Sequence, residues 1–523
     1  MSNNNNSKSL ESWIWDAACA IRGAQDAPKY KDFILPLIFV KRLCDVFDDE
    51  VQKITDKIGD KKRVLKLIEK DRKLTRFYIP FRPENIDDPT WSVIRKLSTN
   101  IGEELTNKLR DIARENPRLQ GIIDRVDFNA TTHGQRDIDD DKLSNLIEEI
   151  SKKRLGLKDV EPDIIGRSYE YLIRKFAEGG GQSAGEFYTS KEVGMIIARI
   201  LDPEPGMEVY DPCCGSAGLL IKCQLVLQEK MELRSKQKYA PLKLYGQEFI
   251  GTTWAMANMN MVIHDMEGTI EIGDTMNSPK FKERNKLKKF DLVTANPMWN
   301  QDNFNQSTYE NDEFERFSAG FPPNGTADWG WVQHILASLK ENGRAGIVLD
   351  TGAVSRGSGN QSTNREKEIR KWFVEKDLIE GVLYLPENLF YNTSAPGIVL
   401  FLNKKKDNLP AGKAGSRKNK ILLINASKEF QKGQPKNFIP EENQNKIVDT
   451  YLNWKEIEKF SKVIDKDEIV KNDYNLSPTR YIHTAEEETY RPIGEILEDL
   501  RELEQEQKEI DRELKNIFKK LGY

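Results

Sequence analysis

Seven short apolar runs, separated by stretches with helical spacing, dominate residues 161–405. The runs span residues 208–211, 242–246, 269–272, 291–295, 345–349, 381–385 and 398–402. Short β runs that alternate with helices are typical of βαβ units, in which successive strands lie parallel. The pattern therefore predicts an α/β fold with a doubly wound, mainly parallel, seven-stranded sheet. Such sheets bind their ligands at the carboxyl ends of the strands.

The regions on either side of this sheet have different patterns. Residues 1–160 carry apolar side chains at helical spacing, which predicts an all-α N-terminal domain. Residues 406–488 are mixed, and we interpret them as a linker and extension. Residues 489–523 repeat apolar side chains at steps of three and four, which predicts a long coiled-coil-like helix. Its seam consists of Ile493, Ile496, Leu500, Leu503, Gln507, Ile510, Leu514, Ile517 and Leu521.

A single helix of this kind is marginal in water unless its seam is buried. The seam could pack back on its own chain, but we favour docking on the helix of a partner subunit. A buried Gln507 would then fix the register of the pair.

Composition excludes several classes of protein. No apolar run approaches the ~20 residues that cross a bilayer, and the polar start of the chain lacks a signal core, so we expect a cytoplasmic protein. Five cysteines without a C-x-x-C pair and four well-separated histidines predict no metal site. The net charge of −4 gives no global sign of nucleic-acid binding.

Asn296, Pro297, Met298 and Trp299 follow the fourth apolar run, at the expected carboxyl edge of the sheet. An exposed tryptophan there can stack on a nucleobase. The amide oxygen of Asn296 and the carbonyl of Pro297 can each accept a hydrogen bond from an exocyclic amino group. The alternative is a turn after a strand, with Trp299 capping the core.

A second group of residues follows the first apolar run: Asp211, Pro212, Gly215, Ser216, Ala217 and Gly218. Small residues let the backbone approach a ligand closely. A leading aspartate would repel a phosphate and suits a positively charged ligand. Glu248 ends the second run and can hold ribose hydroxyls. Asp274 follows the third run and could accept a hydrogen bond from the adenine amino group of a nucleoside cofactor. Glu248 or Asp274 could instead cap a helix.

These segments resemble the motifs of S-adenosylmethionine-dependent amino-methyltransferases. Residues 296–299 are similar to N-P-P-[FYW], with Met298 in place of the second proline. Residues 211–218 are similar to D-P-x-C-G-S-G-G, with Ala217 in place of a glycine. We expect the extra methyl group of Ala217 to be easily accommodated. Residues 185–190 are similar to G-E-F-Y-T-P, with Ser190 in place of proline. Their order along the chain is that of the γ group of these enzymes.

The wider chain resembles the modification subunit of type I restriction-modification systems, on residues 15–23, 30–31, 37–39 and 472–481 and on the terminal helix. The resemblance implies methylation of adenine N6 in duplex DNA after the base has been flipped out. Trp299 would stack on the flipped base, while Asn296 and Pro297 would accept from its amino group. Phe390 is either the second face of the base pocket or an ordinary core residue. We expect activity to survive Met298, with a looser pocket.

The resemblance also implies residues that cover the methionine end of the cofactor: Glu186, Phe187, Tyr188, Thr189, Ser190 and Lys191. Ser190 can equally cap the helix that begins at Lys191. The chain has no obvious base-reading module, and the family uses a separate specificity subunit held by two modification subunits. A nuclease subunit could join them. We therefore expect the isolated chain to bind cofactor but to methylate DNA poorly.

Two other functions remain open from sequence. The same Asn-Pro arrangement can hold the amino group of cytosine N4 or of a protein glutamine, although Asn296 rather than serine favours adenine. Alternatively, Met298 indicates that the catalytic loop has lost its function, and the protein binds cofactor and clamps DNA as an inactive scaffold.

Overall fold

The computed structural model describes residues 10–21, 30–160, 189–235, 238–302, 306–360, 363–390, 393–406, 417–433 and 436–484, with Ser168, Tyr171, Leu172 and parts of 497–514. The chain divides into two compact units, Met1–Ile482 and His483–Tyr523. None of the helices among these residues is both long and apolar enough to span a membrane.

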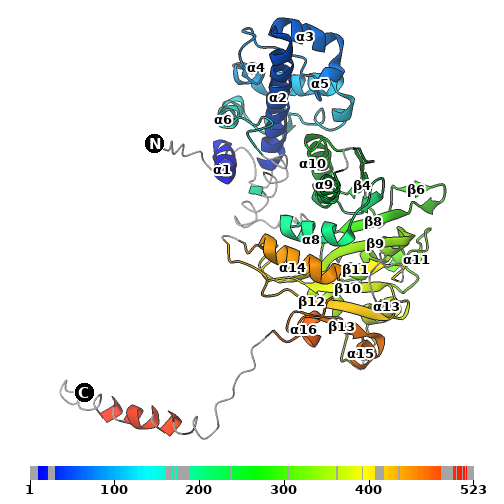
Figure 1. Ribbon diagram of the computed structural model, residues 1–523. Helices are drawn as coiled ribbons and strands as arrows, with labels where there is room; N and C mark the ends of the chain where they lie inside the picture. Colours follow the sequence, from blue (N-terminus) through cyan, green and yellow to red (C-terminus); the bar gives the residue numbers. More distant parts are fainter. Residues whose placement is uncertain are drawn as a thin grey trace. The chain divides into compact units, whose positions relative to one another are not determined.

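A nine-stranded sheet forms the centre of the first unit, in the order β13-β12-β10-β11-β9-β8-β3-β4-β5 (Figure 1). The strands are β3 (Glu208–Asp211), β4 (Lys243–Glu248), β5 (Gly268–Ile272), β8 (Phe290–Ala295), β9 (Leu339–Asp350), β10 (Ile379–Tyr384), β11 (Gly397–Asn403), β12 (Lys420–Asn425) and β13 (Ser461–Asp465). Strands β5, β4, β3, β8 and β9 run parallel, whereas β11 is antiparallel to β9 and to β10. The doubly wound, mainly parallel fold is confirmed.

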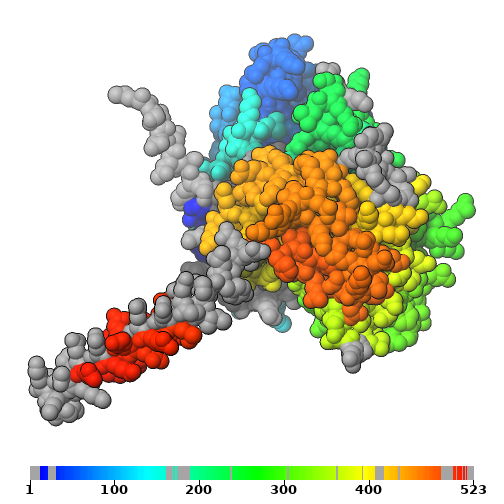
Figure 2. All heavy atoms as spheres, turned by 60° about the horizontal axis from the view of Figure 1, so that its bottom comes forward, coloured from blue at the N-terminus to red at the C-terminus, as the bar shows by residue number. Residues whose placement is uncertain are grey.

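The sheet has two strands more than the sequence predicted. Strand β12 pairs parallel with β10, and β13 pairs antiparallel with β12, so the segment interpreted as linker and extension contributes to the main sheet. Helices α14 (Glu441–Leu452), α15 (Lys466–Lys471) and α16 (Pro478–Tyr481) accompany these strands. Figure 2 shows this segment, in orange, as one surface continuous with the rest of the first unit.

Helices cover both faces of the sheet. On one face, α8 (Lys191–Leu201), α9 (Gly218–Leu233), α10 (Gly251–Ile263) and α14 contribute to a common apolar core. On the other, α12 (Asp328–Ala337), α13 (Arg365–Glu375) and α15 contribute to a second core. Strand β11 shows why both faces can be apolar: Val399 and Phe401 face the first core, while Ile398, Leu400 and Leu402 face the second. The short helix α11 (Gln306–Glu310) and the hairpin β6 (Lys282–Glu283) and β7 (Lys286–Leu287) lie in connecting loops.

The N-terminal region is helical, as predicted. It contains α1 (Leu10–Ala20), α2 (Tyr30–Ile58), α3 (Lys61–Lys70), α4 (Ser92–Arg95), α5 (Ile101–Glu115) and α6 (Asp140–Ser151), with a hairpin of β1 (Thr131–Thr132) and β2 (Gln135–Arg136). Short 3-10 turns lie at Arg72–Leu74 and Pro117–Leu119 in this region, and another lies at Thr351–Val354 after β9. Apolar residues of these helices, among them Trp13, Leu37 and Leu143, are buried in one core.

In the second unit, the described residues between Leu497 and Leu514 are helical. Four of the seam residues, Leu500, Leu503, Ile510 and Leu514, are 44–60% exposed within that unit. Ile493, Ile496, Ile517 and Leu521 lie outside the described residues. The coiled-coil pairing of this helix stays a prediction.

Candidate active site

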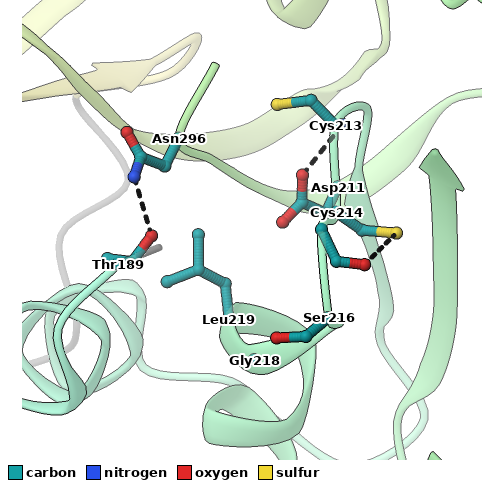
Figure 3. A pocket seen from close by; sticks show the side chains of 9 residues that line it. Thr189, Asp211, Cys213, Cys214, Ser216, Gly218, Leu219 and Asn296 are labelled. Atoms are coloured by element: carbon teal, nitrogen blue, oxygen red, sulfur yellow. Dashed lines mark hydrogen bonds between the residues drawn. The ribbon is translucent and has the colours of Figure 1, made fainter. Parts of the chain in front are cut away.

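A pocket lies at the carboxyl ends of the neighbouring strands β3 and β8 (Figure 3). The space inside the pocket, including its opening to solvent, measures about 340 Å³. Its lining combines residues from all three predicted motifs: Thr189, Asp211, Gly215, Ser216, Gly218 and Asn296. The sequence had not singled out the other lining residues, Cys213, Cys214 and Leu219.

The loop after β3 bends back through two residues with left-handed backbone. Gly215 has φ +52° and Ala217 has φ +62°. A Cβ atom on Gly215 would meet nothing within 4 Å, so this residue faces open space. The left-handed backbone costs Ala217 about 1 kcal/mol relative to glycine, and burial of its methyl group returns a similar amount. The expectation that alanine is easily accommodated was therefore right about space but overlooked backbone strain.

Asp211 is a buried carboxylate at the wall of the pocket. Its Oδ1 accepts a hydrogen bond from the backbone N–H of Cys213 at 3.0 Å. Burial raises the pKa of Asp211 to about 7, with a further rise from the nearby charge of Glu248, against the opposing effect of that hydrogen bond. A cation in the pocket would favour the charged form of Asp211. The group is thus suited to a positively charged ligand.

Glu248 is tied to the loop after β3. Its carboxylate accepts from the backbone N–H of Gly215 at 3.0 Å and of Ile250 at 2.8 Å. The next residue, Phe249, is 71% exposed, which is unusual for a large aromatic side chain. We did not identify Phe249 from the sequence, although an aromatic residue directly after the acid that ends a strand could have indicated it.

Asp274 organises its own turn. Its Oδ1 accepts from the backbone N–H of Met276 at 2.8 Å and of Asn277 at 3.1 Å, and its Oδ2 accepts from the Asn277 side chain at 2.7 Å. Asp274 does not line the pocket. These bonds hold a turn and not the start of a helix, so Asp274 is not the helix cap considered as the alternative, and its contact with a ligand remains a prediction.

Three polar residues that the sequence did not identify hold the pocket loops from behind. Thr275 donates from its hydroxyl to the carbonyl of Pro212 at 2.6 Å, and Asn260 donates to the carbonyl of Ser216 at 3.0 Å. The buried Gln247 makes hydrogen bonds with the backbone of the loop after β5 through both ends of its amide. These contacts link loops distant in sequence, so no local motif marks them.

Asn296 connects two of the predicted motifs. Its Nδ2 donates to Thr189 Oγ1 at 3.0 Å, and its Oδ1 accepts from Trp299 Nε1 at 3.2 Å (Figure 3 shows the first). Trp299 is only 9% exposed, and its ring meets that of Phe390 edge to face with centroids 4.9 Å apart. The expectation of an exposed tryptophan was wrong, because apolar neighbours from β11 and from the loop after β10 enclose the indole.

Pro297 is buried, and Met298 is half-buried. The next residue in the loop after Trp299, Asn300, is anchored by a partly buried ion-pair cluster. Its backbone N–H donates to Asp328 at 3.1 Å, and its side chain accepts from Arg356 at 3.2 Å. Arg356 also pairs with Asp328, with Asp350 at 2.6 Å and with Glu366 at 2.7 Å. These carboxylates raise the pKa of Arg356, which therefore stays charged.

The segment before α8 is described from Thr189 onward, and Glu186, Phe187 and Tyr188 lie outside the described residues. Ser190 accepts at its side chain from the backbone N–H of Val193 at 3.3 Å, which confirms its capping role. Lys191 is the first residue of α8 and is exposed.

The two cysteines that line the pocket, Cys213 and Cys214, are poorly suited to act as nucleophiles. All five cysteines are free thiols. Burial raises the pKa of Cys213 and Cys214 well above the usual range, so both remain protonated and poorly nucleophilic. Within the described residues, no group of three or more His, Cys, Asp or Glu side chains is arranged to hold a metal ion.

Comparison with known families assigns both main regions. Residues 160–490 match the family model described as N-6 DNA Methylase, and residues 10–150 match the HsdM N-terminal domain. The chain is 37% identical over 435 residues to the type I restriction enzyme MjaVII methylase subunit of Methanocaldococcus jannaschii, covering 80% of this chain and 70% of that protein. It is 30% identical over 543 residues to the MjaIX methylase subunit of the same organism, covering 98% and 92%.

Solved structures agree with this assignment. The type I restriction-modification methyltransferase subunit from Streptococcus thermophilus superimposes with a TM-score of 0.69 at 26% identity, covering 90% of this chain and 98% of that one.

Proposed function

Because the chain belongs to the N-6 DNA methylase family, as a methylase subunit of the type I restriction enzymes, we propose that the pocket between β3 and β8 carries out its chemistry. The protein is an S-adenosylmethionine-dependent, adenine-specific DNA methyltransferase. When bound, S-adenosylmethionine supplies a methyl group on a positively charged sulfur.

The residues of the pocket fit this cofactor. The buried Asp211 suits the cofactor's positive charges, and the open space at Gly215 lets a ligand approach the backbone. Outside the pocket lining, Glu248 at the end of β4 would hold the ribose hydroxyls, and the exposed ring of Phe249 beside it would stack on the adenine. Asp274, with Glu186 to Lys191, completes the proposed cofactor set.

Asn296 and Pro297 bind the target. The side-chain oxygen of Asn296 and the carbonyl of Pro297 accept from the amino group of a flipped-out adenine, drawing electron density toward its nitrogen. Trp299 stacks on the base, and Phe390 lies on its other side. No covalent intermediate with the protein is needed, so catalysis consists of positioning and electrostatic stabilisation.

One observation carries the proposal: Asn296 and Asp211 line the same pocket (Figure 3). The residue proposed to bind an amino group and the residue proposed to bind a cation therefore border one volume. A target amine held by the first lies beside a cofactor held by the second, as direct methyl transfer requires.

The test uses the chain purified with its specificity subunit. Methyl transfer to duplex DNA is measured, and the modified base is identified by mass. Asn296→Ala is expected to abolish transfer while cofactor binding persists. Asn311→Ala, an exposed asparagine outside the pocket, is the matched control. Transfer to cytosine or to protein would favour the other amine substrates. Absence of transfer by the wild-type complex, with cofactor binding intact, would favour an inactive scaffold, and wild-type activity in Asn296→Ala would refute the role of Asn296.

We also propose that the C-terminal helix docks on the specificity subunit and that two copies of this chain join that subunit on DNA. The exposure of Leu500, Leu503, Ile510 and Leu514 within their own unit supports a partner for this face. Leu503→Asp should abolish co-purification with the specificity subunit, whereas Glu504→Ala on the same helix should not. Site-specific methylation by the isolated chain at the rate of the complex would contradict the proposal.

A further inference from the structure

Asn296 and Pro297 form the proposed clamp for the target amino group. The acceptor atom of Asn296 in this clamp already has a hydrogen-bond partner. An indole N–H can only donate, so the bond from Trp299 Nε1 identifies the atom of Asn296 facing it as the oxygen. Thr189 accepts from the nitrogen of the same amide. The two neighbours thus fix the orientation of Asn296, and they direct its oxygen at the indole.

This contact opposes base stacking. The N–H bond lies in the plane of the indole, so Asn296 Oδ1 faces the edge of the Trp299 ring. A base stacked on the face of that ring lies about 3.5 Å above its plane. A good hydrogen bond from the amino group to Oδ1 requires about 2.9 Å. Both conditions are met together only when the indole turns away from its present position.

The packing around Trp299 leads to the same conclusion. Phe390 meets the indole at 4.9 Å and 73°, whereas a base between two rings needs them nearly parallel and about 7 Å apart. Gly397 lies against both rings: a Cβ there would be 2.8 Å from Trp299 and 2.9 Å from Phe390. The rings therefore fill the volume that a flipped base would use.

We propose that Trp299 keeps the clamp closed in the free enzyme, its Nε1–H occupying at Asn296 Oδ1 the position that the adenine amino group takes during methylation. This inference rests on the proposed function. Entry of the base exchanges one N–H donor for another, so Asn296 keeps a partner throughout. The indole then turns from donor to stacking surface. Phenylalanine or tyrosine at this position would lack the indole N–H that makes this contact.

The first test removes the N–H and keeps an aromatic ring. Trp299→Phe and wild type are each purified with the specificity subunit, and the duplex DNA carries 2-aminopurine next to the target adenine, so that the target keeps its amino group. Loss of one competing hydrogen bond should raise the flipped-out fluorescence and lower the KM for DNA about twofold to tenfold. An unchanged or higher KM, or unchanged fluorescence, would overturn the inference.

Trp331→Phe is the matched control. Trp331 Nε1 donates to the side-chain oxygen of Gln301 at the same distance of 3.2 Å, outside the clamp. Its loss should leave the KM and the fluorescence unchanged. Failure of the wild-type complex to methylate adenine would refute the proposed function itself, whereas normal methylation without the effect of Trp299→Phe would refute only the closed clamp.

A second measurement observes the indole directly. The full chain is labelled with 5-fluorotryptophan in the complex, and the Trp299 resonance is assigned by its loss in Trp299→Phe. Target-containing duplex should shift the Trp299 resonance and leave that of Trp331 in place. A Trp299 resonance that stays fixed while the DNA is methylated would contradict the turning of the ring.

Discussion

Replacing Asp211 with asparagine tests the electrostatics of the pocket. The pKa of Asp211 lies at about 7 in the folded chain because the carboxyl is buried, against an ordinary value of 3.8. Between these values the folded chain retains a proton that the unfolded chain has released. The free energy of unfolding therefore falls as pH rises toward 7 and stays at its reduced value above it.

The size of the effect follows from the two pKa values. Between about pH 5.5 and about pH 8, this one group should lower the free energy of unfolding by about 2 kcal/mol. The asparagine side chain of the Asp211→Asn variant would not titrate, and its oxygen could still accept from the Cys213 N–H. For a cooperative unit of about 300 residues, the melting temperatures of wild type and Asp211→Asn should diverge by about 3 °C over this range.

Binding of the cofactor should show the opposite dependence. A cationic ligand favours the charged carboxylate, so wild-type affinity should rise with pH up to about 7 and then level off. Asp211→Asn should bind weakly at every pH. Differential scanning fluorimetry with and without S-adenosylmethionine measures both effects, with the exposed Asp141→Asn as control. A difference in melting temperature between wild type and Asp211→Asn that does not change with pH would refute the reasoning.

Three further substitutions separate binding from stability. Phe249→Ala should weaken cofactor binding about tenfold, measured by calorimetry, with an unchanged melting temperature because the ring is 71% exposed. Arg356→Gln should lower the free energy of unfolding in urea by about 3 kcal/mol, since it leaves buried carboxylates unpaired; a loss below about 1 kcal/mol would contradict this. Gly397→Ala should cost about 2 kcal/mol, because its Cβ would press on Trp299 and Phe390; full stability would mean that the rings move aside freely.

The two strands that the sequence analysis missed, β12 and β13, differ in how clearly the sequence indicates them. Strand β12 contains four consecutive buried apolar residues, 421–424, which is the same signal as in the seven predicted strands. Its assignment to a mixed segment was an error of interpretation. Strand β13 lies at the edge of the sheet and buries only Ser461 and Ile464, so its sequence has no regular alternation to detect.

The site residues that lie at strand ends could be predicted from the sequence. Asp211, Glu248 and Asn296 were each predicted at the carboxyl end of a strand, and the structure places them there. The orientation of Trp299 was not readable, because it depends on Phe390 and Gly397, more than ninety residues further along the chain. A local motif indicates which groups are present, but neighbours from distant strands decide which atoms they face.

Met298 illustrates the same separation. A second proline would fix one backbone angle between Asn296 and Trp299. In this chain the segment is instead held at both ends: Asn296 is bound by Thr189 and by Trp299, and Asn300 is bound by Asp328 and Arg356. Hydrogen bonds from outside the segment thus supply part of the restraint that proline supplies from within. Because one of those bonds comes from Trp299 itself, the restraint at Asn296 changes when the indole turns, whereas the anchor at Asn300 does not. The fixed anchor at Asn300 and the exchangeable hydrogen bond at Asn296 are both compatible with methionine at position 298.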